Sequence, residues 1–374
     1  MNDLQAQVGT HQEFPCQQCG AKLHFAPGSS HLECPYCGAT QAIAAPAAGP
    51  AAGPGAVVER SFEEALRAMR QQPVSAIAQD GHEIECNGCG AITVITAQAA
   101  SCPFCDSPVI VPIEEDRATL VPESVLPFAI DERTAGTKFK EWVASRWFAP
   151  NDLAAKARRA RIDGVYLPYF TYDSQTYTRY RGQRGDHYYV TETYTDSQGK
   201  TQTRQVRKTR WTPRSGQVYV AFDDVLICAS KSLPTKLIDG LEPWDLAQLA
   251  PFNPGYLSGF MAERAALGLE EGFDLAKQKM VPRIQGAIRS DIGGDTQRID
   301  SYSTTHNNVT FKLFLLPLWI SSFRYDDKVY RFVVNARTGE VAGERPYSKL
   351  KIALAVLGAI LLIVAIVLLV QHFQ

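Results

Sequence analysis

The sequence predicts an α+β fold in which an antiparallel sheet is preceded by two small cysteine-rich modules and followed by one apolar helix. Three observations predict this: cysteine pairs repeat near the N-terminus, aromatic and β-branched runs alternate with helical patterns in the middle, and a long uncharged segment lies near the end. The 374 residues have a formal net charge of −1 and are 45% hydrophobic. This composition is typical of a globular chain and lacks the basic excess of a dedicated nucleic-acid-binding protein.

Eight of the nine cysteines form four Cys-x-x-Cys pairs, which come in two sets. The first set consists of Cys16, Cys19, Cys34 and Cys37, and the second of Cys86, Cys89, Cys102 and Cys105. Two thiolates at this spacing can reach one ion, and a second pair returned by a short loop completes a tetrahedral shell. The spacing therefore predicts two zinc ribbons, one at residues 10–41 and one, with a short helix, at residues 59–112. Each would hold one structural Zn²⁺ ion.

Three other uses of the cysteines fit less well. Disulfides need an oxidising compartment, and residues 1–14 lack the apolar core of an export signal. A catalytic zinc keeps one position open for water, whereas four cysteines fill each shell. A redox Cys-x-x-Cys pair is expected alone, beside a strand and a helix. The ninth cysteine, Cys228, lies in an apolar stretch and is interpreted as a buried core thiol.

The segment between the two modules is rich in proline, alanine and glycine. It covers residues 42–58 and has no periodic pattern, so we expect a linker that lets the first ribbon move relative to the following chain. Ser61 and Glu64 then form a capping box, which predicts a helix over residues 62–71. Its apolar face is expected to pack on the second ribbon.

Residues 113–346 predict a larger α+β domain. Helices are expected over residues 132–147 and 152–161, and a helical region at 244–272. Strands are expected over residues 165–172, 188–195, 203–211, 218–222, 308–320 and 329–334, with a hairpin turn at 196–199.

The C-terminal segment is long enough to cross a bilayer. Residues 352–370 contain no charged or strongly polar side chain, and we place a transmembrane helix at 350–370. Arg345, Lys349 and Lys351 precede the segment and no lysine or arginine follows it. The positive-inside rule therefore predicts a tail-anchored, single-pass protein of the cytoplasmic (inner) membrane, with its N-terminal domains in the cytoplasm.

The second half of the expected hairpin is basic. Its charged residues are Lys200, Arg204, Arg207, Lys208, Arg210 and Arg214. Together with a neighbouring tryptophan they could bind the phosphates of an anionic lipid, RNA or DNA. The alternative of a solvated edge strand without a binding role stays open, because such strands commonly carry lysine and arginine that prevent aggregation.

Motifs of known enzyme classes are missing from the sequence. Gly199-Lys200-Thr201 resembles the end of a phosphate-binding loop, but the glycine required five residues earlier is replaced by Tyr194. Nucleophile-elbow, zinc-protease and dinucleotide-binding fingerprints do not occur, and the seven histidines are scattered. We therefore expect no catalytic residues and no enzymatic activity.

Short motifs of the middle region accompany the ribbons and the terminal span: Leu126-Pro-Phe, Trp147-Phe-Ala-Pro150, Gly164-Val-Tyr-Leu-Pro-Tyr-Phe170, Phe222-Asp-Asp-Val225, Pro243-Trp-Asp-Leu246 and Pro254-Gly-Tyr-Leu-Ser-Gly-Phe260. In this layout the chain resembles, over nearly its full length, a family of bacterial TFIIB-type zinc-ribbon membrane proteins. The family's ribbon cysteines correspond to the eight named above. Such chains are sometimes called primosomal protein N′-like, but the missing phosphate loop argues against a helicase.

The resemblance also implies partners. Members of the family occur with an SPFH (flotillin-like) protein and a phage-shock, ESCRT-III-like protein, which implies a role in recruiting such proteins to stressed membrane. We therefore expect a non-enzymatic, membrane-anchored adaptor whose contacts are the lipid bilayer and these proteins. The alternative is a membrane-tethered nucleic-acid-binding protein that uses the ribbons and the basic hairpin.

Overall fold

One large antiparallel sheet forms the centre of the protein. The computed structural model describes residues 14–43, 59–71, 82–86, 92–95, 102, 104, 110–112, 120–153, 162–195, 197, 199–326 and 328–372. Within these residues the main path of the sheet has the strand order β10-β9-β13-β14-β15. These strands are β9 (Asp163–Thr195), β10 (Thr201–Cys228), β13 (Thr296–Tyr325), β14 (Lys328–Asn335) and β15 (Val341–Gly343). The predicted α+β class with a large antiparallel sheet is confirmed.

Four short strands pair at the margins of this sheet: β4 (Arg60–Ser61), β8 (Ser124–Val125), β11 (Ala250–Pro251) and β12 (Met261–Ala262). The loops that carry them also contain the short helices α4 (Thr235–Asp239), η1 (Leu246–Gln248) and η2 (Pro254–Leu257). The helical region expected at 244–272 is therefore mostly short turns and strands.

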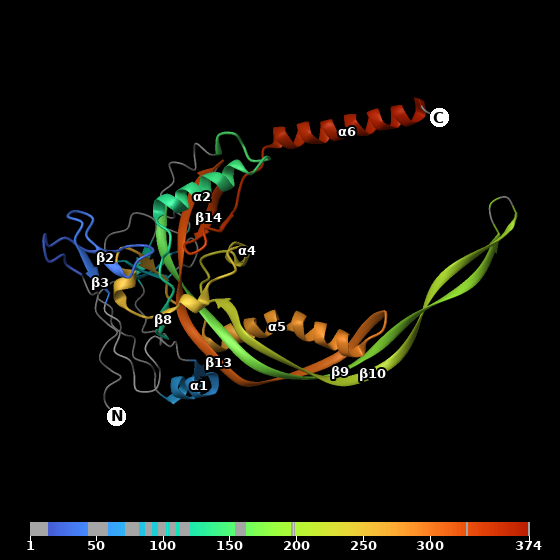
Figure 1. Cartoon of the computed structure of the whole chain (residues 1–374), viewed down its shortest axis with the longest axis horizontal. Helices are drawn as coiled ribbons and strands as arrows, with labels where there is room; N and C mark the ends of the chain where they lie inside the picture. The colour runs from blue at the N-terminus through green and yellow to red at the C-terminus, as the bar shows by residue number, and fades with distance from the viewer. Residues whose placement is uncertain are drawn as a thin grey trace.

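The long strands include residues that lie between the strands expected from the sequence. β9 joins two expected strands into one, β10 joins two more, and β13 begins well before the expected residue 308. These polar stretches lack a clear alternation of apolar and polar side chains, and pairing with a neighbouring strand stabilises them. Bulges in β10 and β13 increase the local bend, and the sheet curves strongly along its length (Figure 1).

The helix α5 (Leu269–Ile292) lies along one face of the curved sheet (Figure 1). It buries one apolar stripe, which includes Phe273, Met280 and Ile288. The helix extends twenty residues beyond the end of the expected helical region at residue 272. A proline inside the helix, Pro282, and two glycines obscured the remaining turns, because these residues are unfavourable in helix interiors.

The helix α1 (Phe62–Gln71) packs on the large domain. Its apolar face contacts the cluster that contains Tyr172 and Phe273, with the ring of Phe62 centred 4.8 Å from that of Phe273. The expectation that this face packs on the second ribbon is therefore wrong. Strand β4 places the start of the helix at this position by pairing with β13.

The helix α2 (Glu132–Ala144) covers another part of the sheet through Phe139 and Val143. It ends earlier than expected, because Ser145 caps its C-terminus, and Trp147 lies outside the helix. Most of the second predicted helix, together with its basic run, lies outside the described residues.

Two small three-stranded sheets accompany the large one. The first consists of β1 (His24–Phe25), β2 (His31–Glu33) and β3 (Thr40–Ala42), and the second of β5 (His82–Cys86), β6 (Ile92–Ile95) and β7 (Ile110–Pro112). Each belongs to one of the cysteine sets. The proposed domain boundaries stay predictions, since much of residues 42–119 lies outside the described part of the chain.

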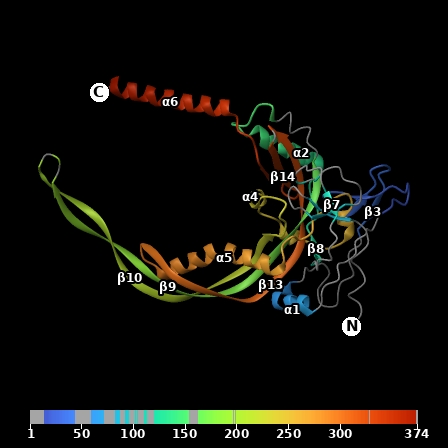
Figure 2. The same cartoon turned by 180° about the vertical axis from the view of Figure 1, so that it is seen from behind.

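The hairpin of β9 and β10 extends far beyond the third strand. β13 begins at Thr296, which pairs with Gly185, so residues 186–195 of β9 and 201–210 of β10 pair only with each other among the described residues. We call this two-stranded segment the arm. It projects away from the main body (Figures 1 and 2).

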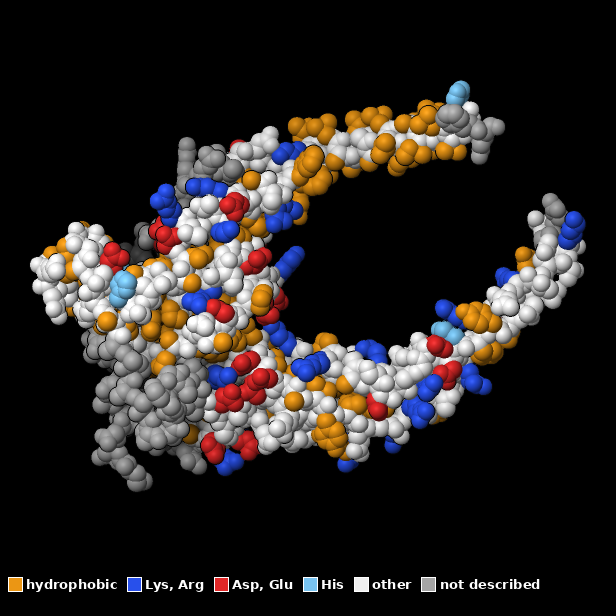
Figure 3. Space-filling view, in the orientation of Figure 1, with side chains coloured by type: hydrophobic (Ala, Val, Ile, Leu, Met, Phe, Trp, Pro, Cys, Tyr) orange, Lys and Arg blue, Asp and Glu red, His pale blue; other side chains and the backbone are white. Residues whose placement is uncertain are grey.

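The C-terminal helix α6 (Lys349–His372) also projects from the body (Figure 1). None of its residues, all of which the structure describes, is buried. It is long and apolar enough to cross a membrane, judged by length and composition. Hydrophobic side chains cover it along its length (Figure 3).

Candidate functional site

The first cysteine set is gathered into one cluster. The sulfur atoms of Cys16, Cys19, Cys34 and Cys37 all lie within 4.8 Å of one another. The Cys16 and Cys37 sulfurs are 3.5 Å apart, as are those of Cys19 and Cys34. A tetrahedral zinc shell with bonds of about 2.3 Å needs sulfur separations of about 3.8 Å. The cluster is therefore a group that could hold a zinc ion.

Two equivalent turns shape this cluster. The N–H of Gly20 donates to the carbonyl of Cys16 at 2.8 Å, and the N–H of Gly38 donates to that of Cys34 at 3.0 Å. Both glycines have φ of +73°, a conformation that residues with a Cβ adopt only at a cost. Each turn places the two sulfurs of its pair on the same side.

The backbone of these turns favours thiolates. The N–H groups of Cys37 and Tyr36 lower the pKa of the Cys34 thiol to about 6. The N–H groups of Cys19 and Gln18 also lower the pKa of Cys16. Although backbone N–H groups lower them, the pKa values of Cys19 and Cys37 are raised instead, that of Cys37 to about 12, because their thiols lie beside the sulfur atoms of the other pair. A thiolate is the form that ligates metal, so an ion would displace the protons that these two cysteines hold.

The first module is docked on the large domain. Phe25 is 3% exposed, and its ring centre lies 5.2 Å from that of Tyr256. Its N–H donates to the carbonyl of Ser258 at 2.9 Å, and the Ser258 hydroxyl donates to the carbonyl of Leu23 at 2.6 Å. The N–H of Gly28 adds a bond to the large domain. The expected free movement of this ribbon is therefore wrong, because its apolar side chains share a core with the sheet.

The second cysteine set is described in part. Cys86 and Cys102 are both buried, and they share an apolar cluster with Phe104 and with Tyr169 of β9. Cys89 and Cys105 lie outside the described residues. The structure thus places half of the second set against the large sheet, and a second ion is not shown.

The basic residues lie along the hairpin. Lys200 is in the connecting turn, whereas Arg204, Arg207, Lys208 and Arg210 belong to the arm and Arg214 lies nearer the body. Because side chains alternate along a strand, Arg207 faces the side opposite the other arm arginines. The predicted residues therefore do not form one continuous basic face.

One acidic residue offsets part of the positive charge of the arm. Glu192 lies 3.6 Å from Arg204 and 3.0 Å from Lys208. Nearer the body, the guanidinium of Arg298 covers the ring of Trp211 at 4.7 Å. Even so, residues 179–214 contain nine lysines and arginines against three acidic residues, so a positive potential remains along the hairpin.

One buried carboxyl group, that of Glu263, was not predicted from the sequence. Glu263 is 2% exposed, and its carboxylate accepts hydrogen bonds from the hydroxyls of Ser230 at 2.9 Å and Ser232 at 2.8 Å. Burial raises the pKa of Glu263 to about 7, although the two hydroxyls act in the opposite direction. Glu263 is a single acidic residue that follows the two-residue strand β12, and nothing in this sequence pattern indicates that its side chain is buried.

A second acidic group lies at the bulge of β10. Asp173, Asp223 and Asp224 have carboxylate oxygens within 4.8 Å of one another, and Asp224 has φ of 51°. The ammonium of Lys312 lies 2.8 Å from Asp224. This group is best described as an ion-paired network that fixes the bulge, a role that the Asp-Asp motif alone did not reveal.

Comparison with known proteins yields one distant relative. The chain is 27% identical over 238 residues to an uncharacterised Bacillus subtilis (strain 168) protein, YdjG, and the match covers 63% of this chain and 66% of that protein. No family model matches the chain, and no solved structure matches it.

Proposed function

We propose that this chain is a non-enzymatic, zinc-binding adaptor anchored in the cytoplasmic membrane by α6. The observation that carries the proposal is that no residue of this apolar helix is buried in the protein. Contact of apolar surface with water costs about 25 cal/mol per Å², and a bilayer removes that cost. The uncharged run of residues 352–370 spans about 28 Å as a helix, close to the thickness of the hydrocarbon region.

The charges beside α6 support an orientation with the body in the cytoplasm. Arg345, Lys349 and Lys351 precede the uncharged run, and lysine and arginine beside a membrane span are enriched on its cytoplasmic side. In that compartment the thiols of the first cysteine set stay reduced and available to zinc. We propose one structural zinc in this set and a second in the set of Cys86, which would make both modules zinc ribbons.

The arm supports a role in binding other proteins. It projects from the body, and it exposes the side chains of Tyr188 and Tyr189, with Tyr189 63% exposed. Tyrosine offers a large contact area and a hydroxyl group for a partner. The resemblance described above suggests the partners, which would be an SPFH protein and an ESCRT-III-like protein on the same membrane.

Site-specific photocrosslinking of the full chain in native membranes tests this proposal. A photoreactive analogue replaces Tyr189 on the arm or, as a matched control, Tyr219, which is 75% exposed but lies nearer the body in β10. We expect crosslinks to an SPFH or ESCRT-III-like protein from position 189, unchanged by nuclease treatment and weaker from position 219. If neither position captures such a protein, the adaptor proposal fails.

The basic hairpin favours a second candidate, membrane-tethered binding of nucleic acid. Charge reversal at Arg204, Arg207 and Arg210 should then weaken binding of DNA or RNA, and the affinity should fall steeply with salt. Binding of the full chain to labelled oligonucleotides at several salt concentrations measures this. If neither salt nor charge reversal changes the affinity, nucleic-acid binding by the basic hairpin is excluded.

A further inference from the structure

Large aromatic side chains are exposed where α6 leaves the body. Trp147 is 82% exposed, Phe148 is 37% exposed and Tyr347 is 60% exposed. Trp147 and Phe148 lie in the turn that follows α2, and Tyr347 lies two residues before the start of α6. We call these three residues the aromatic foot. So much adjacent aromatic surface is unfavourable in water and indicates a surface that is covered in use.

The turn is fastened to the beginning of α6. The ammonium of Lys351 donates to the carbonyl of Trp147 at 3.1 Å and to that of Ala149 at 2.7 Å. The N–H of Ser348 donates to the carbonyl of Phe148 at 2.8 Å. Three hydrogen bonds therefore tie the turn to the first turn of the helix, so the aromatic foot and the helix keep a fixed relation.

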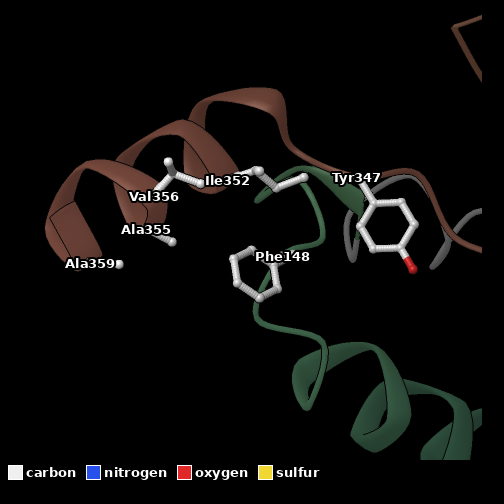
Figure 4. A pocket seen from close by; sticks show the side chains of 6 residues that line it. All are labelled: Phe148, Tyr347, Ile352, Ala355, Val356 and Ala359. Atoms are coloured by element: carbon white, nitrogen blue, oxygen red, sulfur yellow. The ribbon is translucent and has the colours of Figure 1, made fainter. Parts of the chain in front are cut away.

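An apolar groove lies between the turn and the helix. Figure 4 shows the ring of Phe148 facing α6. The groove is lined by Phe148, Tyr347, Ile352, Ala355, Val356 and Ala359, and its lining surface is apolar. It is continuous with the apolar surface of α6, so whatever surrounds this helix also reaches the groove.

The position of the groove along α6 indicates its depth in a bilayer. Ile352 begins the uncharged run, and Val356 lies four residues further on, which is about 6 Å along the helix. Amphipathic elements that lie in a membrane interface insert by about 5–10 Å. The foot is therefore level with the boundary between headgroups and acyl chains when α6 crosses the membrane.

The residue types match that boundary. Tryptophan and tyrosine are enriched at membrane interfaces, because their rings are apolar and their polar atoms reach water. Lys349 lies at the start of α6, where a lysine can extend its ammonium to the headgroups. The guanidinium of Arg345 lies 5.2 Å over the ring of Tyr347, which keeps a positive charge beside the foot.

We propose that the aromatic foot inserts into the interfacial region of the bilayer beside α6, with lipid acyl chains covering the groove. The inference rests on the proposed function, since it assumes that α6 crosses the membrane. It adds a second membrane contact beside the start of α6, formed by side chains of the large domain.

Tryptophan fluorescence in lipid vesicles tests this inference. The five tryptophans are at positions 142, 147, 211, 244 and 319, so α6 contributes none of the signal. The purified full chain is reconstituted with phosphatidylcholine brominated near the glycerol end of the acyl chains. We expect this lipid to quench the wild-type emission and Trp147→Phe to lose most of the quenching, because phenylalanine retains the contact but not the fluorescence. Trp142→Phe, at a position two residues before the end of α2, is the matched control and should retain the quenching.

Flotation of the same vesicles separates the two proposals. If the chain does not float with lipid, the membrane anchor itself is wrong and the foot has no bilayer to enter. If it floats but Trp147→Phe is quenched as strongly as the wild type, the anchor stands and the interfacial foot is refuted. Strong quenching in Trp142→Phe with little in Trp147→Phe supports the inference.

Discussion

The contact between the first cysteine module and the large domain depends on Phe25. This ring is almost fully buried, and its aromatic neighbours Tyr256 and Phe260 both belong to the large domain, with ring centres 5.2 Å and 6.3 Å away. Removing a buried phenyl ring typically costs about 3–5 kcal/mol. We expect Phe25→Ala to weaken docking of the module by about 3 kcal/mol, because the lost contacts cross from one unit to the other.

Native-state hydrogen exchange of the full chain in detergent measures this loss. The N–H of Phe25 donates to the carbonyl of Ser258 across the same contact, and it exchanges when the module separates from the domain. A loss of about 3 kcal/mol increases the open population, and with it the exchange rate, roughly a hundredfold. The N–H of Gly28, which bonds to the carbonyl of Phe128, should exchange faster in parallel.

Tyr36→Ala supplies the matched control. Tyr36 belongs to the same module but is 83% exposed, so its removal should change stability by no more than about 0.5 kcal/mol. If the Phe25→Ala variant exchanges at the same rate as the Tyr36→Ala variant, the buried aromatic contact does not hold the module and the docking argument is refuted.

Three further predictions concern other parts of the molecule. The pKa of Glu263 is about 7 in the folded protein and 4.5 in the unfolded chain, so the folded state binds this proton more tightly. The free energy of unfolding of the wild type should therefore fall by up to about 3 kcal/mol, relative to that of Glu263→Gln, as the pH rises from 4.5 to 7. Thermal unfolding of both proteins across this range measures the difference, and parallel curves would contradict it. Cys34→Ser should lower the zinc content measured by elemental mass spectrometry by about one ion per chain, whereas Cys228→Ser should leave it unchanged. Gly182→Ala places a methyl group 2.4 Å from a backbone carbonyl oxygen of β13 and should destabilise the fold by about 1–3 kcal/mol. Gly286→Ala adds a methyl group that has no described atom of another segment within 4 Å, so it should instead stabilise α5 by about 0.5–1 kcal/mol. Denaturant midpoints compare the two variants.

Features that depend on local spacing could be predicted from the sequence. The cluster of Cys16, Cys19, Cys34 and Cys37 follows from two short turns and one return of the chain, all within one module. The apolar helix α6 follows equally from an uninterrupted run of side chains. In both cases the relevant chemistry lies in consecutive residues, so little tertiary information is needed.

Features that depend on distant contacts could not be predicted. Whether the first module moves is decided by pairs such as Phe25 with Tyr256, which lie far apart in the sequence. The burial of Glu263 depends in the same way on serines from another segment. The length of α5 was hidden because Pro282 interrupts a pattern that packing on the sheet nevertheless stabilises.

The arm has a mechanical consequence. Its ten residue pairs, from Asp186 with Arg210 to Thr195 with Thr201, extend about 33 Å. Both of its strands continue into the body, where β9 pairs with β13 from Gly185 to Asp163. A force applied to the tip along the hairpin acts along the strands. It therefore loads the hydrogen bonds between β9 and β13 together, rather than breaking them one after another. The hairpin is thus built to transmit tension from its tip to the domain that carries α6.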